Sequence, residues 1–319
     1  MPAFLIAVAL AAAAPQPERI SLLREAGEPS LSVHHVPGQG PSVLYVHGST
    51  FPAALSMNYR LHGKSWADDL NARGFDVWSF DLAGYGGSDR AVAPAAGPGS
   101  RKPLGRAPEA AREIERVVRL IVKDTHHPRV SIIAHSWGTI PAGLFAGTHP
   151  ELVDRLVLFG PVAQREGKED QPTAPTELVT ADDQWQSFRS GIPDGKPLIE
   201  RQDFDAWAAA YLATDPSSAR RSPRSVEVPT GPDADFADAW SGHLPYDPSL
   251  IKAPTLLVRG EWDPIARDAD VAFLAAAMKQ VPGGAKSIKL PHGGHRMHLE
   301  QNRQALFDAV AGFLSGGQS

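Results

Sequence analysis

Apolar residues along the chain fall into two alternating patterns: short continuous runs, and stretches in which they recur every three or four positions. The runs Ser42–Val46 and Phe75–Phe80 predict buried strands. Between them, Trp66–Arg73 has the spacing of a helix, and Gly74 stands where that helix should end. Two earlier segments rich in strand-forming residues predict the opening strands, Ile20–Arg24 and Leu31–Val36.

The same alternation continues through the middle of the chain and resumes near its end. Ala107–Lys123 predicts an amphipathic helix whose apolar face is formed by Ile114, Val117, Val118 and Ile121. Further strands and helices are predicted at Arg129–Ala134, Thr139–Thr148, Leu152–Phe159, Thr255–Val258, Asp268–Lys279, Ser287–Leu290 and Arg303–Leu314. Strands joined by helix-length connections predict an α/β fold with a mostly parallel, doubly wound sheet. Such sheets bind ligands at the carboxyl ends of their strands.

The alternation stops between residues 163 and 250, a segment called the insertion below. The insertion is rich in prolines, aspartates and aromatic residues, among them Trp185, Phe188, Trp207, Tyr211, Phe236 and Trp240. Its pattern is not that of a sheet and predicts a mainly helical segment. The core is then expected to consist of residues 19–162 and 251–319.

Composition and charge exclude several classes of function. Hydrophobic residues make up 42% of the chain and charged residues 21%, which is ordinary for a globular protein. A net charge of -5 offers no broad basic surface, so nucleic acid is not an expected partner. The chain has no cysteine, which excludes disulfides, zinc–thiolate sites and a cysteine nucleophile.

The N-terminus carries an apolar stretch of small residues, Ala3–Ala14, that ends in an alanine run before Pro15. This stretch resembles the apolar region and cleavage site of a secretory signal, but no basic residue precedes it. Two alternatives stay open: residues 1–18 are a signal peptide of a secreted or periplasmic protein, or the tail of a cytoplasmic one. The stretch is too short to span a bilayer as a helix, and no integral membrane segment is predicted.

The pentapeptide Ala134-His135-Ser136-Trp137-Gly138 lies between a predicted strand and a predicted helix. This is the context of a nucleophile elbow, a tight turn in which small residues two positions before and after the serine let the backbone approach its neighbours. The helix start adds partial positive charge near a developing oxyanion. A serine that merely caps the helix is the structural alternative. Ser136 is therefore the candidate nucleophile.

A predicted buried strand ends at His47-Gly48, just before Ser49 and Thr50. A loop leaving the sheet there can present backbone N–H groups to the oxyanion that forms when a hydroxyl attacks a carbonyl. Two such donors contribute on the order of several kcal/mol. We assign them to the backbone of Trp137 and of Ser49, with Thr50 as the competitor for the second. His47 is expected to hold this loop through hydrogen bonds.

A carboxylate candidate follows the predicted strand Thr255–Val258, where Gly260 precedes Asp263 by three positions. A serine hydroxyl is a weak nucleophile and needs a histidine base whose tautomer is fixed by a carboxylate. Asp263 is expected to be that carboxylate because its loop leaves the carboxyl edge of the sheet. Glu261 is a possible substitute, and capping of the helix at Asp268 is the structural alternative.

Three histidines follow the next predicted strand: His292, His295 and His298. His295 is the candidate base because two glycines before it allow a sharp loop. His298 is expected on the helix that follows, and His292 too close to the strand. The trio could instead bind a metal ion, but a zinc site would need further ligands at conventional spacing. Neither a metal nor a cofactor is predicted.

Together these residues resemble the α/β-hydrolase superfamily, in the esterase- or lipase-like branch of serine hydrolases with a helical cap. The matching elements are His47-Gly48, Asp81–Ser88, the elbow at Ser136, the loop Gly260–Asp263, and Gly294-His295. The insertion falls where this family carries its cap, between the sixth and seventh strands, and a cap implies an enclosed substrate pocket. Haloalkane dehalogenases and epoxide hydrolases have an aspartate at the elbow, so the resemblance implies neither activity.

The expected function is hydrolysis of a carboxylic ester or lactone through an acyl-enzyme, by Ser136, His295 and Asp263. The expected partner is a small-molecule substrate, with apolar groups favoured by the aromatic residues of the insertion. A proline-iminopeptidase-like amide hydrolase is an alternative, although Ser49-Thr50 stands where those enzymes have a Gly-Gly-Pro-Gly loop. A lyase, a perhydrolase or a ligand receptor on the same fold is another.

Overall fold

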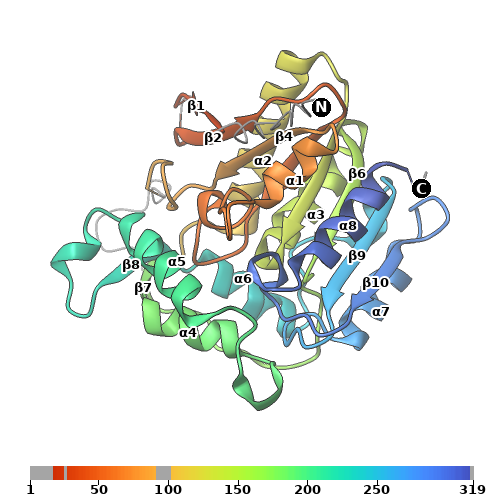
Figure 1. Ribbon diagram of the computed structural model, residues 1–319. Helices are drawn as coiled ribbons and strands as arrows, with labels where there is room; N and C mark the ends of the chain where they lie inside the picture. Colours follow the sequence, from red (N-terminus) through yellow and green to blue (C-terminus); the bar gives the residue numbers. More distant parts are fainter. Residues whose placement is uncertain (1–16, 25–26, 91–101, 317–319) are drawn as a thin grey trace, which may run out of the picture.

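The structure is a computed structural model that describes residues 17–24, 27–90 and 102–316. Eight strands form one mixed sheet in the order β1-β2-β4-β3-β5-β6-β9-β10 (Figure 1). β2 is antiparallel to β1 and β4, and all other neighbours are parallel. The strands are β1 Glu18–Leu22, β2 Leu31–Val36, β3 Ser42–Val46, β4 Asp76–Asp81, β5 Val130–His135, β6 Val153–Phe159, β9 Thr255–Gly260 and β10 Lys286–Leu290. The predicted α/β fold with a mostly parallel sheet is confirmed.

Side chains of the strands alternate between two cores, one on each face of the sheet. In β3, Leu44 and Val46 belong to one core, while Val43 and Tyr45 belong to the other. The first core is covered by α2 Ala107–Thr125, α3 Thr139–Thr148 and α7 Asp268–Ala277, and the second by α1 Trp66–Ala72 and α8 Arg303–Leu314. The four residues predicted for the apolar face of α2 are fully buried, as expected for an amphipathic helix.

The insertion contains a short two-stranded sheet as well as helices, and its sequence pattern did not predict that sheet. Its helices are α4 Ala181–Arg189, α5 Arg201–Ala213 and α6 Gly231–Trp240, and its strands are β7 Thr176–Thr180 and β8 Ser225–Pro229. β7 and β8 pair antiparallel as a separate two-stranded sheet. Both helices α4 and α5 lie between these strands in sequence. The hydrophobic pattern of neighbouring residues therefore could not predict that β7 pairs with β8, because both strands are short and far apart in the sequence.

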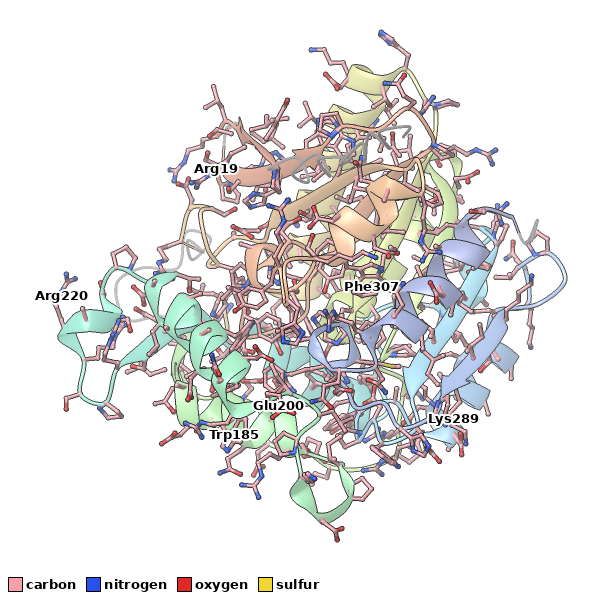
Figure 2. The ribbon with its side chains drawn as sticks, in the orientation of Figure 1. Arg19, Trp185, Glu200, Arg220, Lys289 and Phe307 are labelled. Atoms are coloured by element: carbon pink, nitrogen blue, oxygen red, sulfur yellow. The ribbon has the colours of Figure 1, made fainter. Side chains whose placement is uncertain are left out.

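Aromatic side chains of the insertion pack largely against one another. Trp207 and Tyr211 are fully buried, and their rings stack with centroids 5.4 Å apart. Trp207 also joins the insertion to the core, because its indole N–H donates to the Leu55 carbonyl at 2.9 Å and its ring lies 5.2 Å from that of Phe51. The insertion thus lies along the edge where the parallel strands end, with Arg220 at its outer tip (Figures 1 and 2).

Within the described residues, no helix is both long and apolar enough to cross a membrane. The apolar stretch Ala3–Ala14, with its two alternatives, lies outside the described residues.

Candidate active site

Ser136 stands in a sharp turn between β5 and α3. Its φ of 56° is in the left-handed region, which residues with a side chain seldom adopt. Gly138 is needed in this turn, because a Cβ atom there would lie 2.4 Å from the carbonyl oxygen of His47. The backbone conformation is that of the predicted elbow, and it presents the serine at the carboxyl edge of the sheet.

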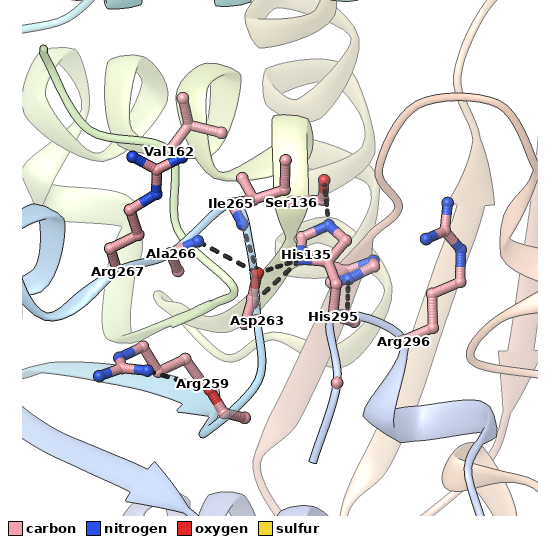
Figure 3. Close-up of polar contacts among 12 residues, drawn as sticks. His135, Ser136, Val162, Arg259, Asp263, Ile265, Ala266, Arg267, His295 and Arg296 are labelled. Carbon is pink, nitrogen blue, oxygen red and sulfur yellow. Dashed lines mark hydrogen bonds and ion pairs between the residues drawn. The ribbon is translucent and has the colours of Figure 1, made fainter. Parts of the chain in front are cut away.

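The structure brings Ser136, His295 and Asp263 together from three loops (Figure 3). Nε2 of His295 lies 2.8 Å from Oγ of Ser136, and Nδ1 lies 2.9 and 3.0 Å from the two oxygens of Asp263. A carboxylate only accepts hydrogen bonds, so Nδ1 carries the proton and Nε2 is left to accept one from the serine. Asp263 also accepts from the backbone N–H groups of Ile265 and Ala266, at 2.8 and 3.1 Å, which fixes its orientation.

Gly160, directly after β6, makes room for this arrangement. A Cβ atom at Gly160 would lie 2.9 Å from a carboxylate oxygen of Asp263 and 3.0 Å from two atoms of the His295 ring. Its φ of 59° is also in the left-handed region. A side chain at this position would therefore press the histidine and the aspartate apart. The sequence alone gave no reason to single out this glycine.

The competing acid and base candidates lie elsewhere. Glu261 accepts from the backbone N–H of His292 at 2.9 Å, and both side chains are exposed. His298 is buried in the short 3₁₀ helix Met297–Leu299, ahead of α8 and not on it as expected. Burial lowers the pKa of His298 well below its ordinary value, which keeps the ring neutral. In the described part of the chain, no three His, Asp or Glu side chains are grouped as they would be to hold a metal ion.

His47 holds the loop after β3, as predicted from its position. The ring is fully buried, its Nε2 accepts from the Leu82 backbone N–H at 3.0 Å, and its Nδ1 donates to the Gly48 carbonyl at 2.6 Å. Both nitrogens are satisfied in the neutral form, and burial lowers the pKa of the ring.

A comparison with protein families decides which family this fold and site represent. The model of the alpha/beta hydrolase fold family matches residues 41–301, a range that contains Ser136, Asp263 and His295. The chain belongs to the α/β-hydrolase fold family. No curated protein matches the sequence.

Solved α/β-hydrolase structures and this chain share the fold over most of their length. A thioesterase domain from the curacin biosynthetic pathway is 19% identical, with a TM-score of 0.62 over 93% of this chain and 99% of that chain. A serine hydrolase involved in carbazole degradation gives the same values. An epoxide hydrolase mutant from Vigna radiata is 15% identical, with a TM-score of 0.61 over 94% of this chain and 99% of that chain. Identities this low show a common fold and do not select among these activities.

The loop expected to form the oxyanion hole of this α/β-hydrolase packs directly against the elbow. A Cβ atom at Gly48 would lie 2.9 Å from Cβ of Ser136, so only glycine lets the two segments approach so closely. Within the described residues, neither the backbone N–H of Ser49 nor that of Trp137 donates to another group. Thr50, the competitor for Ser49, adopts a φ of 74°.

Asp235 of α6 is a residue of this site that the sequence did not reveal. Its carboxylate, fully buried, accepts from the indole N–H of Trp137 at 2.9 Å, from the Ala107 backbone N–H at 2.7 Å, and from Arg106 at 2.6 Å. Burial raises the pKa of Asp235, and the charge of Arg106 opposes that rise. The insertion thereby holds Trp137, the residue that follows Ser136. No local motif indicates the contact between Asp235 and Trp137, because nearly a hundred residues separate them in the sequence.

Proposed function

We propose that the chain is a serine hydrolase that cleaves a carboxylic ester or a lactone through an acyl-enzyme. The observation that carries the proposal is the continuous chain of contacts from Oγ of Ser136 through the His295 ring to Asp263, at 2.8 to 3.0 Å. A serine within hydrogen-bond reach of a histidine that a carboxylate orients is the arrangement that activates a hydroxyl for attack on a carbonyl.

In the proposed reaction, Oγ of Ser136 attacks the carbonyl carbon as His295 takes its proton at Nε2. Asp263 stabilises the resulting imidazolium. The backbone N–H groups of Ser49 and Trp137 stabilise the tetrahedral oxyanion. His295 then donates its proton to the departing alkoxide, which leaves as an alcohol. A water molecule, activated by the same histidine, finally releases the acid and restores the serine.

The direct test is a substrate panel with the full-length protein. It contains p-nitrophenyl esters of several chain lengths, aliphatic lactones and aminoacyl p-nitroanilides, and turnover is followed before and after treatment with a fluorophosphonate. We expect hydrolysis of esters or lactones, and its loss on treatment. Turnover confined to the anilides would favour the proline-iminopeptidase-like alternative. No turnover of any substrate, together with no covalent labelling, would contradict the proposal.

We further propose that the insertion acts as the cap of this enzyme and selects apolar groups of the substrate. Phe236 and Trp240 support this, because with Ile265, two residues after Asp263, they form the apolar part of a pocket of about 300 Å³ whose wall also contains Glu169, Asp170 and Asp233. We expect kcat/KM to rise with acyl chain length, by up to about fourfold per methylene, since burying one contributes roughly 0.8 kcal/mol. Phe236→Ala should flatten this series. Trp185→Ala, which changes an aromatic side chain that does not line this pocket, should leave the substrate ranking unchanged. An unchanged ranking in Phe236→Ala would mean that the aromatic residues are structural.

Asp235→Ala is expected to lower kcat about tenfold or more with little change in KM. The reason is that Trp137 would no longer be fixed, and donors to the oxyanion act mainly in the transition state. Asp238→Ala is the matched control, because Asp238 pairs with the same Arg106 but has no contact with Trp137. Rates are expressed per active site titrated with fluorophosphonate, which separates a lower kcat from a loss of folded protein. Equal kcat in the two variants would show that Asp235 serves stability alone.

A further inference from the structure

A polar pocket of about 320 Å³ opens between the insertion and the loop after β3, with Arg296 in its wall. Its wall is formed by residues 177–179 of β7, by α4, by Thr50 and by Arg296. Two of these residues adjoin the proposed catalytic machinery in sequence: Arg296 follows His295, and Thr50 follows Ser49. The pocket therefore adjoins the two loops that carry His295 and the proposed oxyanion donor Ser49.

Arg296 brings a positive charge to this pocket, and no carboxylate of the described residues forms an ion pair with it. Its Nη1 donates to the Ser187 carbonyl at 3.0 Å, and its buried Nε has no partner in the described part of the chain. Its guanidinium lies 5.9 Å from the centre of the Phe51 ring and 5.3 Å from that of Phe188. Burial lowers the pKa of Arg296 to about 10, so the group remains charged at neutral pH. Figure 3 shows Arg296 on the other side of His295 from Asp263.

Two further polar side chains in the wall are buried and poorly satisfied among the described residues. Gln184 is 1% exposed; its amide interacts with the Tyr211 hydroxyl but makes no hydrogen bond of good geometry. The buried hydroxyl of Thr50 has no partner either. A buried polar group without a partner is costly, and each such case calls for a ligand or a water molecule to satisfy it. Together with Arg296, these groups place several buried donors in the wall of one pocket.

Two acidic residues also line the pocket, but neither neutralises Arg296. Asp183 accepts from the backbone N–H and the hydroxyl of Thr180, at 2.8 and 2.7 Å, and so caps α4. Glu177 forms no ion pair among the described residues, and burial raises its pKa to about 7. Of the carboxyl groups whose charge acts on Arg296, Asp263 is engaged by His295, and Glu300 accepts from the Gly294 backbone N–H at 2.9 Å.

We propose that this pocket binds a carboxylate of the substrate, with Arg296 as its main anchor and Gln184 and Thr50 as further donors. The proposal rests on the proposed ester hydrolysis and makes the preferred substrate an ester that carries a free carboxylate. A guanidinium presents donors in a fixed plane that matches the two oxygens of a carboxylate. The Phe51 and Phe188 rings lie against the guanidinium, and contact with them in place of water strengthens such a charged interaction.

The test compares pairs of esters that have the same shape but differ in charge. Monomethyl glutarate and methyl 5-methylhexanoate place the difference on the acyl side, and 4-acetoxybenzoate and 4-acetoxybenzamide place it on the alcohol side. In wild type, kcat/KM should be higher for the anionic ester than for the neutral ester of at least one pair, and the ratio of the two values measures the preference. Arg296→Gln should lower that preference about tenfold or more, which is the usual effect of losing a hydrogen bond to a charged group. Arg296→Lys should keep part of it.

Arg220→Gln is the matched control, because it removes one positive charge at the outer tip of the insertion (Figure 2). For each pair of esters, this variant should leave the ratio of kcat/KM for the anionic ester to kcat/KM for the neutral ester unchanged. The rate of fluorophosphonate labelling, compared between wild type and Arg296→Gln, shows whether the elbow is intact in the variant. Hydrolysis of the neutral esters with no preference for either anionic one would overturn the carboxylate site and leave the proposed hydrolase function standing.

Binding measurements cover the case in which no ester is hydrolysed, which would count against the proposed function. Glutarate and its neutral counterpart 5-methylhexanamide are titrated into wild type and Arg296→Gln by calorimetry. Tighter binding of glutarate to wild type, lost in Arg296→Gln, would support the carboxylate site on its own. Equal binding of glutarate to both proteins, or none to either, would overturn it.

Discussion

Ser136→Ala is expected to abolish ester hydrolysis while the protein stays folded. Removing a nucleophile whose attack begins the reaction costs on the order of 10⁵- to 10⁶-fold in kcat. The variant should also resist labelling by a fluorophosphonate, because that reagent forms its covalent bond with the serine oxygen. The fold should tolerate the change, since alanine fits the turn and, within the described residues, the lost side-chain hydrogen bond is the one to His295 at 2.8 Å. Initial rates and intact-protein mass spectrometry measure the two effects.

Ser131→Ala provides the control for this experiment. Ser131 is a buried serine of the same strand, β5, and its hydroxyl faces Asp154 at 3.5 Å instead of a histidine. This variant should keep wild-type turnover and labelling. Near-normal turnover by Ser136→Ala would show that another group is the nucleophile, and labelling of Ser136→Ala at an unchanged rate would show the same.

The regular part of the fold was predictable because its signals are local. The runs at β3 and β5 are buried throughout and mostly apolar, since parallel strands with helices on both faces have no solvent side. Ser136 could be recognised because an elbow needs a strand, a small residue and a helix in direct succession. Asp263 and His295 could be predicted as the acid and the base because each follows a parallel strand. The carboxyl ends of these strands lie at the same edge of the sheet as Ser136.

The parts that escaped prediction depend on contacts between distant segments. Asp235 contacts Trp137 from the insertion, and Gly160 clears a space for two side chains from other loops. Nothing in the neighbouring sequence of either residue indicates such a partner. Arg296 is a related case: a lone arginine after a histidine is usually solvated, and only its contacts with Phe51 and Phe188 make the charge unusual.

Asp263→Asn is expected to lower kcat about 10⁴-fold without loss of the fold. Asparagine has nearly the same shape, but its amide group can donate to Nδ1 of His295. The ring would then carry its proton on Nε2, which faces Oγ of Ser136 at 2.8 Å and could no longer accept the serine proton. His295→Ala, which removes the base itself, should cost at least as much. Because the three residues act as a unit, the double variant should be little worse than His295→Ala alone.

The controls separate this effect from general disturbance of the loops. Glu261→Gln and His292→Ala alter the exposed pair on the same two loops and should leave kcat unchanged. His298→Ala removes a fully buried ring that packs on Phe159, with centroids 5.6 Å apart, so we expect a lower melting temperature and a nearly normal kcat per titrated site. A loss of kcat in Glu261→Gln as large as in Asp263→Asn would move the orienting carboxylate to Glu261. That result would require the loop to rearrange, because Glu261 now accepts from the His292 backbone and not from the imidazole of His295.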